Sequence, residues 1–199
     1  MNMVFSDFSE LEGSNCYCSD ECAAEIRRRI AGLPLRAIHL IGTGDYHYQT
    51  LFWLERIEVP FALLLLDNHP DDQPGAFGDS LLSCGSWVAA ARRLPLLEYF
   101  RWVRRAEDYR PEELPAGLPV YISLDLDLLS EDFARTDWDQ GDMSLGELLA
   151  ILSELKASGA ELAGMDICGG ISEEKSGSLA DMELNRSTTE AVAALFRDC

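Results

Sequence analysis

Residues that can bind a metal follow a buried apolar run in the stretch LLLLDNHPDD, residues 63–72. After four leucines, the chain places Asp67, His69 and Asp71 at every second position. Removing two carboxylates and an imidazole from water is costly unless something binds them. The spacing therefore indicates a bound metal ion. The alternative is a strand-end cap with a structural salt bridge.

A second pair of carboxylates repeats this pattern in SLDLDLL, residues 123–129. Asp125 and Asp127 are two residues apart, so on an extended strand both side chains would lie on the same face. Two carboxylates this close repel each other unless a cation neutralises them. Such a pair also occurs by chance at a strand edge, but its recurrence after the first stretch favours a metal site.

His47, in GTGDYHY at residues 42–48, completes the candidate ligands, with an ordinary loop histidine as the alternative. Four carboxylates and two imidazoles are about what two adjacent divalent ions require. Oxygen and nitrogen donors without thiolate favour Mn²⁺, with Zn²⁺ or Fe²⁺ as the other choices. Two such ions can share a water, lower its pKa and hold it for attack on an electrophilic carbon or phosphorus. The predicted metal ligands are His47, Asp67, His69, Asp71, Asp125 and Asp127.

Strand-like and helix-like segments alternate along the chain, which is the pattern of a parallel sheet covered on both faces. Ligands of such sheets bind at the carboxyl ends of the strands. We therefore predict a single three-layer α/β/α domain over residues 1–199, in which residues 1–35 are a cysteine-containing segment and the first helix. Strands are predicted at 36–42, 60–67, 98–105, 120–129 and 160–170, and helices at 19–32, 48–57, 85–94, 144–159 and 185–198.

The composition restricts partners and compartment. A formal net charge of −19 argues against nucleic acid and anionic membranes, because phosphate binding needs clustered lysine and arginine. No apolar run approaches the length of a membrane span. The first ten residues, MNMVFSDFSE, lack the features of a secretory signal. We therefore expect a cytoplasmic protein whose six cysteines are thiols and whose partner is a small-molecule substrate.

The three stretches together resemble those of the ureohydrolases, the family of arginase, agmatinase and formimidoylglutamase. DNHPD matches the family motif Asp-Ala-His-x-Asp, and SLDLD matches Ser-x-Asp-x-Asp at Ser123, Asp125 and Asp127. GTGDYHY is similar to Gly-Gly-Asp-His, with Tyr46 inserted before the histidine. The resemblance covers about residues 36–170. It implies an arginase-like fold, reduced in size, and two Mn²⁺ ions. Many members form trimers or hexamers, but this chain is too short to assume their interface, so a homo-oligomer stays open.

Two departures from the family concern recognition of the substrate. The family's late glutamate, which binds the guanidinium group, is replaced by Gly169, and its His-Gly-Thr becomes Cys84-Gly85-Ser86. A site built for a cation loses discrimination without its carboxylate partner. The metal-binding half of the motif set is retained, whereas arginase activity itself is doubtful.

These observations give one main hypothesis and its alternatives. The main hypothesis is a metal-dependent hydrolase of the ureohydrolase type, in which activated water attacks the C–N carbon of a guanidine, amidine or amide. Asp67 and Asp125 would hold the water between the ions, Asp71 would orient it, and His47 and His69 would each complete the coordination of one ion. The alternatives are a di-metal phosphoesterase or deacetylase, and an arginase-fold protein that binds metal without ureohydrolase activity.

Other chemically active side chains have simpler interpretations. His39, inside the apolar run AIHLI, is interpreted as a core residue. Cys16, Cys18 and Cys22 lack an obvious fourth ligand for a metal and are interpreted as free thiols. A sharper hypothesis is that their loop folds over the site and replaces missing substrate contacts. Cys84 is interpreted as a small pocket residue rather than a nucleophile, because no histidine remains to act as its base.

Overall fold

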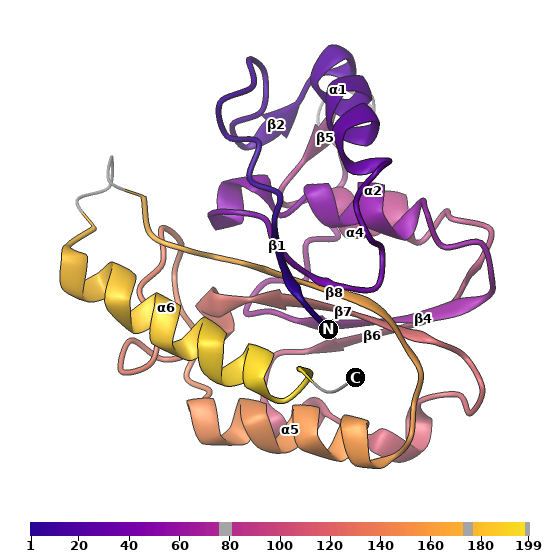
Figure 1. The fold of residues 1–199 in the computed structure, drawn as a ribbon, viewed down its shortest axis with the longest axis vertical. Coiled ribbons are helices and arrows are strands. Elements are labelled where there is room, and N and C mark those ends of the chain that lie inside the picture. The colour runs from indigo at the N-terminus through magenta and orange to yellow at the C-terminus, as the bar shows by residue number, and fades with distance from the viewer. Residues whose placement is uncertain (76–80, 173–176, 198–199) are drawn as a thin grey trace.

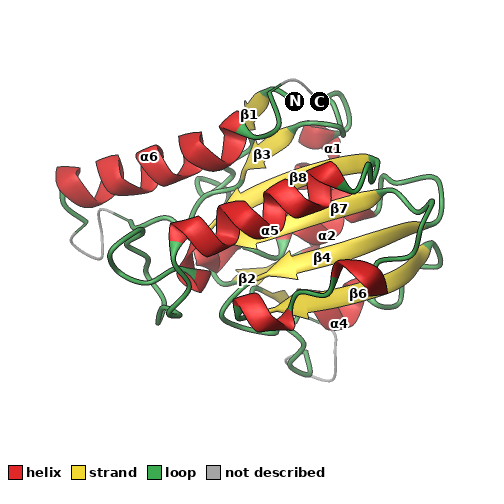
Figure 2. Cartoon of the chain, turned by 90° about the horizontal axis from the view of Figure 1, so that it is seen from below, coloured by secondary structure: helices red, strands yellow, loops and turns green. Residues whose placement is uncertain are grey.

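A six-stranded parallel sheet forms the centre of the computed structural model, which describes residues 1–75, 81–172 and 177–197. The strand order is β1-β3-β8-β7-β4-β6, and every neighbouring pair is parallel (Figure 2). The strands are β1 (Met3–Phe5), β3 (Ile38–Leu40), β4 (Phe61–Leu66), β6 (Leu97–Val103), β7 (Val120–Asp125) and β8 (Leu162–Cys168). The predicted parallel sheet is confirmed.

Helices cover both faces of this sheet (Figure 1). One face carries α1 (Asp20–Ile30), α2 (Gln49–Leu54) and α4 (Trp87–Ala91). The other face carries α5 (Leu145–Ala157) and α6 (Leu179–Ala194). The fold is therefore the three-layer α/β/α arrangement expected from the alternating segments.

The sequence of β4 shows why a strand of this sheet is apolar along its whole length. Ala62, Leu64 and Leu66 pack into the hydrophobic core on the α5 and α6 side. Phe61, Leu63 and Leu65 belong to the core on the α1, α2 and α4 side. Because alternate side chains enter opposite layers, both faces of the strand are buried and neither can be polar.

Hydroxyl side chains begin three of the helices. Ser19 accepts a hydrogen bond from the backbone of Cys22 at the start of α1, and Ser144 forms a capping box with Glu147 at α5. Helix α6 begins at Leu179, six residues before the predicted start at 185, because Ser178 and Asp181 form another capping box. Helix α4 ends at Ala91, so the predicted helix at 85–94 was too long.

Three short strands escaped the sequence analysis. Strand β1 pairs with β3 at the edge of the main sheet, and β2 (Tyr17–Cys18) pairs with β5 (Leu82–Ser83) in a separate antiparallel ribbon. Strands of two or three residues are too short to show a period of two in hydrophobicity. Both β1 and β2 lie in the N-terminal segment before α1, which is therefore joined to the rest of the chain at two places. None of the helices in the described ranges is long and apolar enough to cross a bilayer.

Candidate metal centre

The predicted ligands converge at the carboxyl ends of neighbouring strands. Asp67 follows β4 directly, and Asp125 is the last residue of β7, which pairs with β4. His47 follows the 3-10 turn η1 (Gly44–Tyr46), which comes after β3. This turn accommodates the extra residue Tyr46. Parallel strands present their carboxyl ends at one edge, so segments 80 residues apart meet there.

The predicted arrangement of Asp125 and Asp127 on one extended strand was wrong. Strand β7 ends at Asp125, and Asp127 lies in the 3-10 turn η4 (Leu126–Leu128). The carboxylate of Asp125 accepts a hydrogen bond of 2.9 Å from the backbone N–H of Asp127, which caps this turn. Both carboxylates are nevertheless buried in the same site, because the turn brings Asp127 toward His69.

Three carboxylates surround one nitrogen of His47. Its Nδ1 lies 3.0 Å from Asp71 Oδ2, 3.3 Å from Asp67 Oδ2 and 3.4 Å from Asp125 Oδ2. The His47 side chain is 2% exposed, so solvent does not separate these groups. A nitrogen enclosed by three carboxylate oxygens is stable only with a cation, either a proton or a metal ion, on it.

The other nitrogen of His47 is fixed by a buried hydrogen-bond chain. Ser123 Oγ donates to Asp166 Oδ1 at 2.8 Å, so the hydroxyl accepts from His47 Nε2 at 2.9 Å. With the proton on Nε2, the lone pair of neutral His47 is on Nδ1 and points at the three carboxylates. Metal-binding histidines are oriented in this way by a partner on the far nitrogen.

His69 belongs to a second group with Asp67 and Asp127. Its Nδ1 is 2.9 Å from Asp127 Oδ2 and 3.7 Å from Asp67 Oδ1, while Nε2 is 3.2 Å from Asp139 Oδ1. The hydrogen bond with Asp127, together with the neighbouring negative charges, raises the pKa of His69 to about 10. Asp139 thus occupies the place of an outer partner for this second histidine.

The protonation of the cluster reflects its burial and its excess of negative charge. Burial and the charge of Asp127 raise the pKa of Asp125 to about 7, and burial raises the pKa of Asp67 well above its ordinary value. Burial alone would lower the pKa of His47, but the neighbouring Cys168 and the carboxylates of Asp67 and Asp71 raise it well above its ordinary value. In the described ranges, the ion pairs of these carboxylates are with histidines and not with lysine or arginine.

Asp71 has a strained backbone that aims its carboxylate into the site. Its φ of 47° lies in the left-handed region, which residues other than glycine rarely adopt. The buried indole of Trp87 donates to Asp71 Oδ2 at 2.7 Å and holds the side chain in place. Strain of this kind costs about 1–3 kcal/mol and concentrates at functional sites.

These donors fit a pair of divalent cations. His47, Asp67 and Asp71 form one group whose candidate ligand atoms all lie within 4.8 Å of one another, and Asp67, His69 and Asp127 form another. Asp67 is shared by the two groups, and its Oδ2 is buried without a hydrogen-bond partner. A buried carboxylate oxygen of this kind is costly unless a cation satisfies it.

A cavity of 320 Å³ opens beside the two groups. Its lining includes Asp67, His69, Asp71, Asp125 and Asp127 together with Cys16, Tyr17, Gln73, Cys84 and Trp138. The N-terminal cysteine segment therefore reaches the site, as the sharper hypothesis for this loop required. Cys84 lines the cavity, in agreement with its interpretation as a pocket residue. The described part of this lining contains no lysine or arginine.

Sequence reasoning missed Trp138, Asp139 and Cys168 as parts of the site. Trp138 donates from Nε1 to Asp45 Oδ1 at 2.9 Å and lies edge-on to His69, with ring centroids 6.2 Å apart. Trp138 and Asp139 are in a loop whose sequence, TDWDQGD, shows no periodicity. Cys168 had a signal in the sequence, because it lies near the carboxyl end of the predicted strand at 160–170, where site residues of parallel sheets collect.

The position of Gly169 explains one departure from the family motif. Its φ is +87°, and a Cβ atom placed there would lie 1.9 Å from Asp125 Oδ1. No side chain fits at this position without moving the carboxylate of Asp125. A glutamate therefore could not simply replace Gly169 in this backbone.

Comparisons with known proteins agree with this geometry. A hypothetical agmatinase from Burkholderia thailandensis superposes with a TM-score of 0.67 at 20% identity, covering 90% of this chain and 67% of that one. Proclavaminate amidinohydrolase from Streptomyces clavuligerus gives 0.66 at 16% identity, covering 88% and 68%. Formimidoylglutamase from Bacillus subtilis gives 0.63 at 14% identity, covering 88% and 66%. The chain has the arginase/ureohydrolase-type fold.

Sequence comparison supports the assignment less strongly than the structural comparison does. No family model matches the chain. An uncharacterized protein of Thermotoga maritima is 32% identical over 145 residues, which cover 66% of this chain. The match spans 57% of that relative's length. The arginase-type fold is thus shown by structure, and the activity has to be argued from the site.

Proposed function

We propose that this chain is a metal-dependent hydrolase of the ureohydrolase type, acting on the C–N carbon of a guanidine, amidine or amide. The observation that carries the proposal is the surroundings of His47. Its Nε2 is committed to Ser123, and its Nδ1 faces three carboxylate oxygens at 3.0–3.4 Å. A buried arrangement of this kind is suited to a divalent cation. Arginase-type neighbours with agmatinase and formimidoylglutamase names support the same reaction class.

Two divalent ions would be held by the clustered side chains, and we propose Mn²⁺ because the donors are mainly carboxylate oxygen and imidazole nitrogen. Asp67 lies within 3.7 Å of both histidines, and it would be shared by the two ions together with Asp125. The first ion would be held by His47, Asp67, Asp71 and Asp125, and the second by His69, Asp67, Asp125 and Asp127.

Bound divalent ions supply a water of lowered pKa and withdraw charge from the substrate. The protein residues would position that water and receive its proton. Asp71 is the candidate for this role, because Trp87 fixes its Oδ2 and its carboxylate lines the cavity. A carboxylate held in one orientation can accept the water's hydrogen bond throughout the attack.

The cavity restricts the size and charge of the substrate. A volume of 320 Å³ accommodates a small molecule and excludes a folded polypeptide. With Gly169 unable to carry a side chain, the glutamate that the family uses for the guanidinium group is absent at this position. Contacts from Trp138, Gln73 and the N-terminal segment at Tyr17 would have to select the substrate instead.

The test is ammonia or urea release by Mn²⁺-loaded protein from a panel of guanidines, amidines and amides. Activity should disappear with chelator, return with Mn²⁺, and be lost in His69→Ala. The matched control is His39→Phe. Of the three histidines in the chain, His39 is the one outside the site, and phenylalanine keeps an aromatic ring against Trp53. Equal loss of activity in both variants, with both folded, would contradict the proposal.

The same preparation distinguishes the alternatives. Turnover of chromogenic phosphates or acetylated amines, without turnover of any C–N substrate in the panel, would identify a phosphoesterase or deacetylase. Full metal occupancy without turnover of any of these compounds would identify an arginase-fold metal-binding protein.

A further inference from the structure

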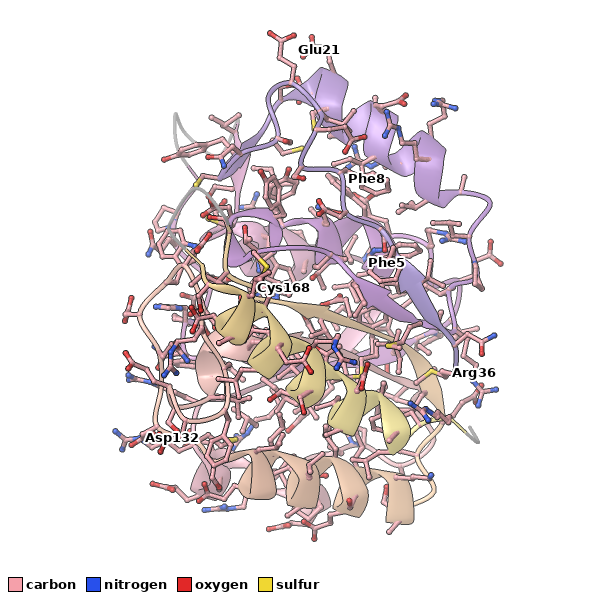
Figure 3. The ribbon with its side chains drawn as sticks, turned by 60° about the vertical axis from the view of Figure 1, so that its left-hand side comes forward. Phe5, Phe8, Glu21, Arg36, Asp132 and Cys168 are labelled. Carbon is pink, nitrogen blue, oxygen red and sulfur yellow. The ribbon has the colours of Figure 1, made fainter. Side chains whose placement is uncertain are left out.

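Cys168 places a sulfur atom beside the cluster of predicted ligands. It is the last residue of β8, and the parallel register pairs it directly with Asp125 at the end of β7. Its side chain is buried, and Sγ lies 3.0 Å from Asp125 Oδ2, to which the thiol donates. Figure 3 shows Cys168 inside the molecule, near the carboxyl end of the sheet.

The sulfur shares its neighbours with the first cation position. His47, Asp125 and Cys168 form a third group whose candidate ligand atoms lie within 4.8 Å of one another. Asp125 Oδ2, the acceptor of the thiol hydrogen bond, is also the oxygen 3.4 Å from His47 Nδ1. Of the candidate metal groups within the described ranges, this one alone contains a cysteine.

The backbone around Cys168 holds the sulfur in this place. Gly169 packs so closely that an added Cβ would meet Asp125 Oδ1 at 1.9 Å and the backbone nitrogen of Leu126 at 2.7 Å. The ends of β7 and β8 are therefore in close contact. The thiol of Cys168 lies there beside a carboxylate and an imidazole, both of which are candidate ligands, and not in an apolar contact.

Building on the two-cation site of the proposed function, we propose that Cys168 Sγ is a further ligand of the cation held by His47 and Asp125. The thiol proton passes to solvent as the metal–sulfur bond forms. Thiolate is a soft donor that favours zinc, iron or cobalt over manganese. The first position would then have a higher affinity for a thiophilic divalent ion, relative to Mn²⁺, than the second position, where His69, Asp67 and Asp127 supply oxygen and nitrogen donors alone.

The test uses Co²⁺, because a cobalt–thiolate bond gives a charge-transfer band in the near ultraviolet that oxygen and nitrogen ligands do not give. Metal-free, reduced full-length protein is titrated with Co²⁺, and bound cobalt is counted by elemental analysis. The variants are Cys168→Ser and Cys168→Ala, with Cys84→Ser as the matched control. Cys84 also lines the cavity but is in none of the described candidate metal groups. Thermal unfolding of each metal-free variant reports whether it is folded.

The proposal expects the band in wild type and in Cys84→Ser, and its loss in both Cys168 variants. It also expects the affinity for Zn²⁺ relative to Mn²⁺ to fall in Cys168→Ser by at least the roughly tenfold that a lost outer partner costs. Two bound cobalt ions per chain without the band, or with a band that survives in both Cys168 variants, would overturn this inference and leave the two-cation site standing. No stoichiometric cobalt in wild type would overturn the two-cation site, and this inference with it.

Discussion

His39 and His47 are both buried and lie eight residues apart, yet their surroundings push their pKa values in opposite directions. His39 lies in β3, stacks on Trp53 with ring centroids 3.5 Å apart, and contacts the carbonyl of Leu35 at 3.1 Å. Burial lowers its pKa to about 4. His47 lies past the end of the same strand, where neighbouring acidic side chains raise its pKa well above its ordinary value.

The comparison separates the interior of the sheet from its carboxyl edge. In the interior, a titratable side chain is tolerated because it stays neutral. At the edge, four carboxylates, of which Asp67, Asp125 and Asp127 are buried, face two histidines, so negative charge is in excess. Burial is common to both regions, so the arrangement of carboxylates is what distinguishes a core histidine from a metal-ligand candidate.

The largest effect expected is stabilisation by metal. A ligand that binds the native state alone at 1,000 times its dissociation constant adds about 4 kcal/mol to the free energy of unfolding. For a chain of this length, that corresponds to a rise of roughly 10 °C in the unfolding temperature. Calorimetric scans of metal-free protein with and without Mn²⁺ measure it. An unchanged unfolding temperature at saturating Mn²⁺ would contradict the claim that the carboxyl edge of the sheet, unlike its interior, binds cations.

The next effect concerns the interior histidine and pH. Because the pKa of folded His39 is about 4, against an ordinary value of 6.5, the unfolded chain takes up the proton first as the pH falls. Stability from neutral His39 is therefore full above pH 6.5 and is lost as the pH falls toward 4, by roughly 3 kcal/mol. The measurement is urea unfolding of wild type and His39→Phe across this range. If the stability difference between the two proteins did not change with pH, His39 would not be held neutral by burial.

A third substitution, in the site itself, should stabilise the metal-free protein, whereas most substitutions lower the free energy of unfolding. In metal-free protein, Asp125→Asn removes one of the repelling charges, and the amide oxygen still accepts the hydrogen bond from the backbone of Asp127. We expect metal-free Asp125→Asn to be more stable than metal-free wild type by about 1–3 kcal/mol. Denaturant unfolding in the presence of chelator measures the difference. A destabilised variant would mean that the carboxylate is structurally satisfied without a cation.

The smallest effect concerns the outer partner of His47. Ser123→Ala removes the hydroxyl that links His47 Nε2 to Asp166 by hydrogen bonds, and it leaves every predicted ligand unchanged. Loss of such a partner typically weakens metal binding by about 10–100-fold. Titration calorimetry with Mn²⁺ measures the change, with Ser83→Ala as a control hydroxyl at the cavity that contacts Ser86. Equal affinities in wild type and Ser123→Ala would show that the chain does not orient the imidazole.

Much of this organisation was predictable because it depends on local patterns. Continuous apolar runs gave β4 and β7, and the alternation with helices gave the parallel sheet. Since parallel strands place their carboxyl ends together, the polar residues after those runs had to meet, and the structure brings all six predicted ligands into one cluster.

The rest depended on long-range geometry that no local pattern contains. The pairing of Cys168 with Asp125 follows from strand order, which puts β8 beside β7 although 36 residues lie between the end of β7 and the start of β8. Trp138 and Asp139 reach the site from an aperiodic loop. A turn forms at Asp127 where the strand was predicted to continue. The side chain of Asp125 caps this turn, and such a local hydrogen bond competes with the extended backbone of a strand.

The most direct test of the account is the metal content of protein purified without chelator, with wild type beside His69→Ala and Asp125→Ala. The account predicts about two divalent ions per chain in wild type, loss of at least one in His69→Ala and loss of both in Asp125→Ala. No bound metal in wild type, even after Mn²⁺ is added in excess, would contradict it and leave the carboxylate cluster without the cation that its geometry requires.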